Sequence, residues 1–156
     1  MAIAQKLQDF LKANTVPYDE IEHPRAVSAS RAAQAARVPG ERVAKTVVLH
    51  DAEGYLIAVV PSTHRVELDT LQDQLGRRLD LATEAEIAAL FSDCDIGAAP
   101  AIGAAYGVNV MCDESLATQP EIYFDAGNHM ELVRVDQSAF ETLMQGAAWG
   151  RFSHRE

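Results

Sequence analysis

The sequence predicts an α+β fold in which helices flank a mixed, curled, barrel-like β-sheet. Strand-like segments occur at irregular intervals, and the helical segments do not follow the steady strand–helix alternation of a doubly wound parallel sheet. Two neighbouring strand-like segments are separated by a four-residue turn, which indicates an antiparallel hairpin. The chain has 156 residues, of which 48% are hydrophobic, enough to form one core. We therefore expect a single domain over residues 1–156.

Five segments have the apolar spacing or the capping residues of helices. Ser28 can cap an alanine-rich helix that stops before Pro39 and Gly40. Thr83 and Glu86 form a capping-box pattern, and Asp136 is placed to cap the last helix. The expected helices cover residues 2–14, 28–37, 67–75, 84–91 and 136–145.

Six segments are expected as strands because they are short, rich in β-branched or aromatic residues, and bounded by turn residues. They cover residues 18–22, 43–50, 55–60, 108–112, 121–125 and 131–135. The turn at residues 51–54 joins the second and third strands into the hairpin. Residues 146–156 follow the last helix and are expected to form a loose C-terminal tail.

The composition argues against several classes of protein. A formal net charge of −10 is unsuited to extended contact with duplex DNA. No apolar run approaches the roughly 20 residues that span a bilayer, and no signal-peptide pattern is present, so we expect a cytoplasmic protein without membrane contact. Cys94 and Cys112 do not form a Cys-x-x-Cys motif and are expected as reduced thiols.

The strand from Val43 to His50 is the segment around which a site is expected to form. Because side chains alternate along a strand, Lys45 shares a face with Val47 and Leu49, and Thr46 points the other way into ordinary sheet packing. An ammonium on an apolar face either extends to water from the strand end or points into a polar hole that a ligand fills. The pattern leaves both interpretations open.

Positive charge is concentrated just before and within this strand. Residues 23–45 contain five cations and one acid, a net +4, so the remaining residues carry −14 of the total of −10. This stretch is either a solvated helix face or a small basic surface that contacts a few phosphates. The cations are Arg25, Arg31, Arg37, Arg42 and Lys45.

The sequence contains none of the Gly-x-Ser-x-Gly, P-loop, His-Glu-x-x-His or Gly-x-Gly-x-x-Gly motifs, and its five histidines lack metal-ligand spacing. We therefore expect no metal or cofactor, and any catalysis to depend on positioning and oxyanion stabilisation. The loop Gly97-Ala98-Ala99-Pro100, with Gly103, suits this chemistry because glycines let N–H groups approach a ligand and proline stiffens the backbone. It could equally be a plain connection. His129 is either a pocket residue or an exposed turn histidine, and His23 and His64 are weaker candidates.

Several stretches together resemble the YbaK-type family of free-standing aminoacyl-tRNA deacylases and of editing domains in bacterial prolyl-tRNA synthetases. The similarity covers about residues 2–144. The matching stretches are Glu22-His23-Pro24 after Tyr18, residues 43–49, residues 58–61, Gly97 to Pro100 with Gly103, residues 106–108, and residues 124–127.

The resemblance implies an α+β, YbaK-like fold with a pocket for the aminoacyl end of tRNA. It implies that Lys45 and the loop residues Gly97, Ala98, Ala99 and Pro100 are catalytic. Two differences are visible: synthetase domains place three residues between the loop glycine and proline, where this chain has two, and some alanine-specific relatives have asparagine at the position of Thr46. The candidate substrate-binding residues are His23, Arg25, Arg42, Thr46, Gly103, Gly127 and His129.

On this basis we expect a monomeric hydrolase that edits mischarged tRNA in trans and contacts only its acceptor end, with a synthetase as a possible partner. Lys45 would lie near the ester, and the loop amides would hold the carbonyl oxygen. One alternative is a non-catalytic module that binds an aminoacyl-adenosine-like ligand or docks on a synthetase, which the shortened loop motivates. Another is a thiol sensor that uses Cys94 and Cys112.

Overall fold

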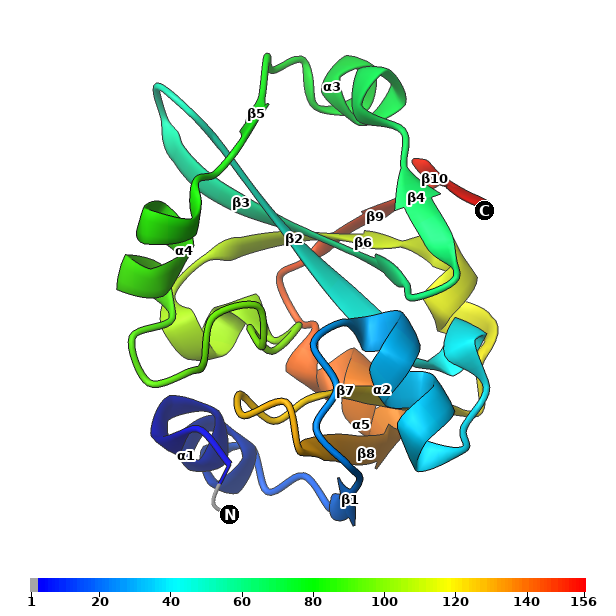
Figure 1. The fold of residues 1–156 in the computed structure, drawn as a ribbon. Helices are drawn as coiled ribbons and strands as arrows, with labels where there is room; N and C mark the ends of the chain where they lie inside the picture. Colours follow the sequence, from blue (N-terminus) through cyan, green and yellow to red (C-terminus); the bar gives the residue numbers. More distant parts are fainter. Residues whose placement is uncertain (1–2) are drawn as a thin grey trace.

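The computed structural model describes residues 3–156 and has a mixed α+β architecture (Figure 1). The helices are α1 (Gln5–Ala13), α2 (Ala29–Ala36), α3 (Leu68–Leu75), α4 (Glu84–Leu90) and α5 (Gln137–Leu143). The strands are β1 (Asp19–Glu22), β2 (Ala44–Asp51), β3 (Gly54–Pro61), β4 (His64–Val66), β5 (Asp80–Leu81), β6 (Asn109–Asp113), β7 (Glu121–Asp125), β8 (Glu131–Asp136), β9 (Ala148–Gly150) and β10 (Ser153–Arg155). The short 3-10 helices are η1 (Gly40–Arg42), η2 (Gly103–Tyr106) and η3 (Glu114–Thr118).

The largest sheet is mixed, as predicted, and has the strand order β5-β2-β3-β6-β9. β2 and β3 form the predicted antiparallel hairpin, whereas β3 pairs with β6, and β6 with β9, in parallel. A second, antiparallel sheet has the order β1-β8-β7. An isolated bridge from Val43 to Tyr123 joins the two sheets. The α+β prediction is confirmed, and the sheets of the described residues curl without closing into a barrel.

The two faces of the β2–β3 hairpin bury different cores. One face carries Ala44 and Val48 into the main core, which α1 and α5 also enter. The other face carries Leu49 into a smaller core beneath α3, with Val47 packed against it. In Figure 1, α3 and β5 lie above the hairpin, and the β1-β8-β7 sheet with α1 and α5 lies below it. This division decides where consecutive residues of β2 point.

The predicted caps form as expected. The Ser28 side chain accepts a hydrogen bond from the backbone N–H of Arg31 at the start of α2. Thr83 and Glu86 make both hydrogen bonds of a capping box at α4, and Asp136 caps α5 through the N–H of Ala139. Each such cap satisfies N–H groups that have no partner within the helix.

The expectation of a loose C-terminal tail is wrong. β9 pairs with β6, and β10 pairs with β4. Phe152, between these strands, is fully buried, and its N–H donates to the buried carboxylate of Asp113 at 3.0 Å. Burial of one large apolar side chain is worth about 2 kcal/mol, which together with the pairing of β9 and β10 offsets part of the entropy cost of ordering this segment. Within residues 3–156, no helix is long and apolar enough to cross a membrane.

Candidate functional site

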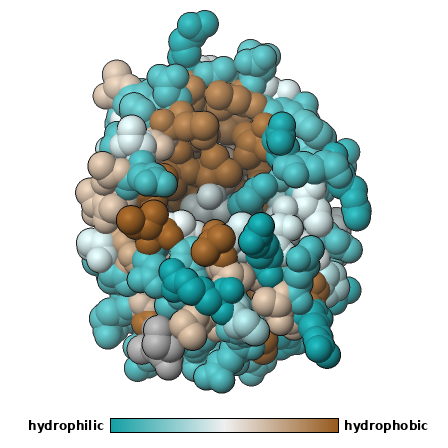
Figure 2. All heavy atoms as spheres, viewed as in Figure 1, coloured by the Kyte–Doolittle hydropathy of each residue, from teal (hydrophilic) through white to brown (hydrophobic). Residues whose placement is uncertain are grey.

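A cavity of about 240 Å³ opens between β2, α2, α4 and residues 94–99, with the end of β7 at its back. Most of its walls are apolar. Figure 2 shows apolar side chains gathered in a hollow on the face of the molecule seen in Figure 1, with polar side chains around it. The lining residues are Ala29, Ala32, Val43, Ala44, Lys45, Thr46, Val48, Glu84, Ile87, Ala88, Phe91, Cys94, Asp95, Ile96, Gly97, Ala99, Asp125 and Leu132.

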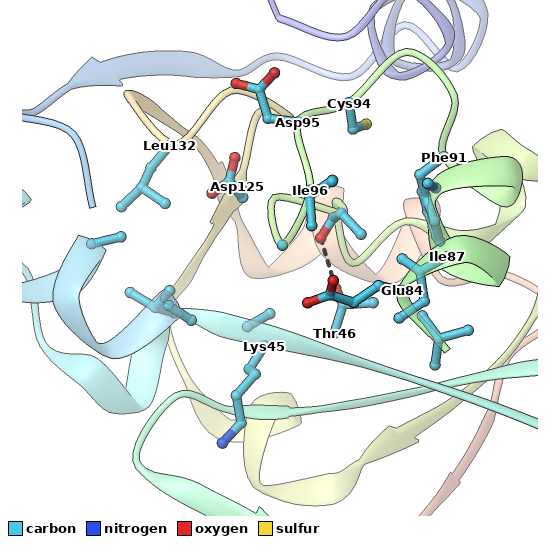
Figure 3. Close-up of a pocket in the computed structure, with 18 residues that line it drawn as sticks. Lys45, Thr46, Glu84, Ile87, Phe91, Cys94, Asp95, Ile96, Asp125 and Leu132 are labelled. Carbon is cyan, nitrogen blue, oxygen red and sulfur yellow. Dashed lines mark hydrogen bonds between the residues drawn. The ribbon is translucent and has the colours of Figure 1, made fainter. Parts of the chain in front are cut away.

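Residues 95–99 form a tight turn fixed to both sheets. The N–H of Asp95 donates to the carbonyl oxygen of Gly127 at 2.8 Å, and the N–H of Ala98 donates back to Asp95 at 3.0 Å. The Thr46 hydroxyl donates to the carbonyl oxygen of Ala99 at 3.0 Å (Figure 3). Gly97 has φ +82°, in the left-handed region that glycine adopts without steric cost. The loop is therefore held to the rest of the molecule at two of these points, one of them a β2 side chain.

Two of the predicted loop residues line the cavity and two do not. Gly97 and Ala99 border it, and neither of their N–H groups has a hydrogen bond among residues 3–156. Ala98 and Pro100 are buried behind them, and the N–H of Ala98 is used by the turn. Because an unpaired N–H beside an apolar cavity is a donor without a partner, these two amides are suited to hold a developing oxyanion.

Lys45 and the loop lie on opposite faces of β2. The Lys45 ammonium donates to the carbonyl oxygen of His64 in β4 at 2.6 Å, and Figure 3 shows it pointing away from Thr46 and Ile96. The residue borders the cavity, but its charged end does not enter it. Burial lowers the pKa of Lys45, and the nearby Glu156 acts in the opposite direction. The expectation that this ammonium and the loop amides face the same space is wrong.

Thr46 takes the place beside the loop that was expected for Lys45. The alternation of β2 that points Lys45 toward β4 turns Thr46 toward Ala99. Ordinary sheet packing is therefore not its only role, because its hydroxyl fixes the position of the loop.

His129 lies behind the loop, outside the cavity wall. The side chain is buried, with Nδ1 3.0 Å from the carbonyl oxygen of Ala26 and Nε2 2.6 Å from that of Ile96. It thus joins the loop to the segment before α2. Gly127, two residues earlier, has φ +105°, and a Cβ there would lie 2.9 Å from the Ala4 side chain. Gly127 is needed for packing against α1.

The other predicted residues lie away from the cavity. His23 is buried, and its Nε2 has no partner within residues 3–156. It borders a separate groove with Glu22 and Glu131. Gly103 is packed so tightly that a Cβ would lie 2.7 Å from the carbonyl oxygen of Val108.

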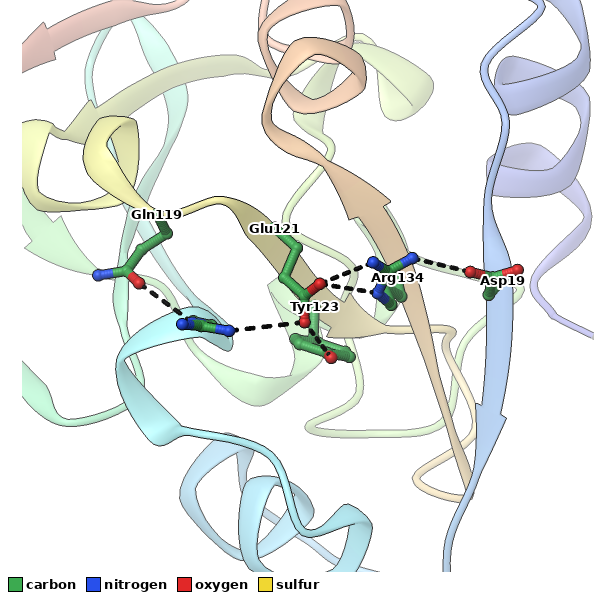
Figure 4. Close-up of polar contacts among 6 residues, drawn as sticks. Asp19, Gln119, Glu121, Tyr123 and Arg134 are labelled. Atoms are coloured by element: carbon green, nitrogen blue, oxygen red, sulfur yellow. Dashed lines mark hydrogen bonds and ion pairs between the residues drawn. The ribbon is translucent and has the colours of Figure 1, made fainter.

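The two predicted arginines differ in their availability. Arg42 contacts Gln119 at 3.3 Å and Glu121 at 3.8 Å, in the polar network of Figure 4. Arg25 is exposed, has no ion pair among residues 3–156, and shares a surface groove with Arg31 near the start of α2. Of the two, only Arg25 is free to meet a ligand.

Asp125, which the sequence reading did not single out, places a carboxylate at the back of the cavity. Its Oδ1 accepts hydrogen bonds from the N–H groups of Gly127 at 2.8 Å, Asn128 at 3.3 Å and His129 at 3.4 Å. Burial raises the pKa of the Asp125 carboxyl, and these N–H groups act against that shift. In the sequence, the one feature that could have pointed to Asp125 is its position as an acid at the end of an apolar strand, directly before Ala-Gly.

The cavity contains no reactive nucleophile. Burial raises the pKa of the Cys94 thiol to about 12. The thiol is therefore protonated at neutral pH, whereas the thiolate is the reactive form. Cys112 is fully buried, and burial raises the pKa of both thiols, which argues against the thiol-sensor alternative. Within residues 3–156, no group of three or more His, Cys, Asp or Glu side chains is arranged to hold a metal ion.

Comparison with known proteins agrees with this architecture. The profile of the aminoacyl-tRNA editing domain matches residues 23–143. A solved structure described as that of a candidate trans-editing enzyme for prolyl-tRNA synthetase is 24% identical, with a TM-score of 0.82 over 97% of this chain and 96% of that one. A hypothetical protein of solved structure is 18% identical, with a TM-score of 0.83 over 96% of this chain and 100% of its own. No protein with a curated description matches the sequence.

Proposed function

The chain belongs to the aminoacyl-tRNA editing domain family, and from this premise we propose that it hydrolyses, in trans, the ester bond of mischarged tRNA. The observation that carries the proposal is the pair of unpartnered N–H groups, of Gly97 and Ala99, on a fixed loop beside an apolar cavity. A tetrahedral intermediate of ester hydrolysis needs such donors at its oxyanion, and one donor is typically worth about 10²–10³ in rate.

In the proposed reaction, the aminoacyl group occupies the cavity with its carbonyl oxygen against these two N–H groups. Water attacks the carbonyl carbon, and the negative charge that develops on the oxygen is held by the two amides. The bond to the ribose oxygen breaks, and that oxygen takes a proton from the attacking water. The products are a free amino acid and uncharged tRNA. The neighbouring ribose hydroxyl of the substrate orients the water, so no side-chain base is required.

The tRNA end lies across the mouth of the cavity in this proposal. Lys45 has one hydrogen bond among the described residues, so its ammonium has two further N–H groups for a terminal phosphate. Its role is therefore to bind tRNA, not to stabilise charge at the ester. Arg25 and Arg31 form a separate basic surface near the start of α2, while Arg42 stays in its internal network.

Two exposed apolar side chains give the terminal base a surface to cover. Ile96 is 65% exposed and borders the cavity, and Val27 is 60% exposed. The carbonyl oxygen of Val27 would be 3.9 Å from a Cβ at Gly97, so both residues flank the loop. Contact with a nucleobase would remove this apolar area from water.

The size of the cavity selects the amino acid. Its volume of about 240 Å³ and its apolar walls favour small side chains and exclude bulky ones. The cavity thus acts as a second size filter after the synthetase. A synthetase cannot reject a slightly smaller amino acid by binding alone, because one methylene changes the binding free energy by only about 1–3 kcal/mol.

The proposal is tested by measuring rates of hydrolysis on a panel of mischarged tRNAs. Two variants at adjacent positions of one helix are compared, one at the cavity and one outside it. Ala88 and Ala89 are both exposed on α4, but only Ala88 borders the cavity. Ala88→Phe should fill part of the cavity and slow hydrolysis of every substrate at least tenfold, while Ala89→Phe should keep the wild-type rate. Absence of hydrolysis by the wild-type protein across the panel would remove the proposed function. Equal rates for the two variants would place the reaction outside this cavity.

A further inference from the structure

The proposed reaction uses none of the three carboxylates that line the cavity, and of these Glu84 and Asp95 are exposed whereas Asp125 is not. Asp125 lines its back wall, and no cation pairs with its carboxylate among residues 3–156. All three of its hydrogen bonds go to Oδ1, and Oδ2 has no partner in the described part of the chain. A largely buried carboxylate without an ion-pair partner is costly, and the hydrogen bonds within the described part of the chain compensate only its Oδ1.

Ion pairing within residues 3–156 does not explain a charge at this position, although the electrostatic influence of His129 acts to lower the pKa of the Asp125 carboxyl. Leu132, its pairing partner on β8, lines the same cavity, as do Val43 and Ala32, and all three are apolar and buried. The hydrogen bonds to Oδ1 shape the turn after β7, and an asparagine oxygen can also accept them, although less strongly than a carboxylate. The turn therefore requires an acceptor at this position and does not require a negative charge.

We propose that Asp125 binds the α-ammonium group of the aminoacyl ester, and so restricts the enzyme to substrates whose amino group is free. The inference rests on the proposed function, because an aminoacyl ester is the ligand that brings an ammonium and a carbonyl into this cavity together. Asp125, Gly97 and Ala99 line the same cavity, so one ligand can reach all three. A charge-assisted hydrogen bond in such a site contributes about 10- to 100-fold in affinity.

The consequence is a substrate class. Aminoacyl-tRNA with a free α-amino group is accepted. Esters whose nitrogen is formylated, or acylated as in peptidyl-tRNA, lose the charge and add bulk at the closed end of the cavity, and they are spared. An enzyme that edits in trans meets these species in the same solution, so recognition of the ammonium would protect them from hydrolysis.

The test compares substrates of equal size that differ only in this charge. Alanyl-tRNA and lactyl-tRNA carry an ammonium and a hydroxyl, respectively, at the α-carbon. We expect the wild-type protein to hydrolyse alanyl-tRNA about 10- to 100-fold faster in kcat/KM. Asp125→Asn keeps the acceptor for the turn and removes the charge. It should therefore lower kcat/KM for alanyl-tRNA to the value for lactyl-tRNA and leave kcat/KM for lactyl-tRNA unchanged. Asp95→Asn removes a charge from the exposed mouth, where water screens it, and should change the ratio less than twofold.

A binding measurement separates failure of this inference from failure of the proposed function. Non-hydrolysable 3′-(alanylamino)-3′-deoxyadenosine and its lactyl counterpart are titrated by calorimetry into the wild-type protein and Asp125→Asn. Preference of the wild type for the alanyl compound, lost in the variant, supports the ammonium site even if no tRNA is turned over. Equal affinity for both compounds, binding of neither, or an equal loss of both in Asp125→Asn overturns it; the last result would be that of a general base or a structural residue.

Discussion

Removal of the Thr46 hydroxyl tests whether the loop must be held in place for catalysis. Thr46→Val keeps the shape of the side chain and deletes the hydrogen bond to the Ala99 carbonyl, which is 3.0 Å long. A neutral hydrogen bond contributes about 1 kcal/mol net, which corresponds to a fivefold shift between the held loop and its displaced forms. If the Ala99 amide becomes misaligned altogether, the loss approaches the 10²–10³ of one missing oxyanion donor. We therefore expect kcat to fall between about 5-fold and 10²-fold.

The assay is single-turnover hydrolysis of the best substrate from the tRNA panel, at saturating enzyme. Thr46→Ser is the control, because it restores a hydroxyl with slightly less packing and should recover most of the rate. Thermal unfolding shows whether the variants keep the wild-type fold. The reasoning is refuted if Thr46→Val has the wild-type kcat, or if Thr46→Ser is as slow as Thr46→Val while both remain folded.

Two further predictions concern charge. Lys45→Ala should raise KM for tRNA with little change in kcat, because the ammonium lies on the far face of β2. The increase in KM should become smaller at higher salt, which screens phosphate contacts. A large fall in kcat at an unchanged KM would instead show that the lysine acts at the ester. The Arg77 guanidinium holds the pKa of Asp51 at about 2, below an unfolded value near 3.9, so the pair stabilises the fold above pH 4 and loses that contribution as the pH falls toward 2. Arg77→Ala should therefore lower Tm at pH 7 and have little effect near pH 2, and a pH-independent difference in Tm would contradict this assignment.

Much of the fold could be predicted because its signals are local. The β2–β3 hairpin follows from two β-branched runs around Asp51-Ala52-Glu53-Gly54, and the capping box at Thr83 requires only its own helical turn. β9 and β10 could not be predicted in the same way. Each has three residues, too few for a periodic pattern, and each forms only because a strand distant in sequence offers an edge.

The site was harder to predict than the fold, because it depends even more on contacts between residues distant in sequence. Alternation along β2 places Lys45 and Thr46 on opposite faces, as the sequence indicates, but it cannot say which face borders the cavity. That choice is made by α4 and residues 95–99, which pack against the Thr46 side. His129 likewise takes its two ring partners from Ala26 and Ile96, which are 103 and 33 residues away in sequence. Contacts of that separation leave no local pattern in one sequence.

The most direct test of the central claim is an amide chemical-shift titration with a phosphonate analogue of an aminoacyl-adenosine, whose tetrahedral oxygens mimic the oxyanion. We predict that the largest changes in ¹⁵N–¹H shifts occur at Gly97 and Ala99, and that both amides become protected from exchange with solvent. Binding that leaves these two amides unmoved and shifts those around His23 or Arg25 instead would contradict the claim that the loop holds the reacting carbonyl.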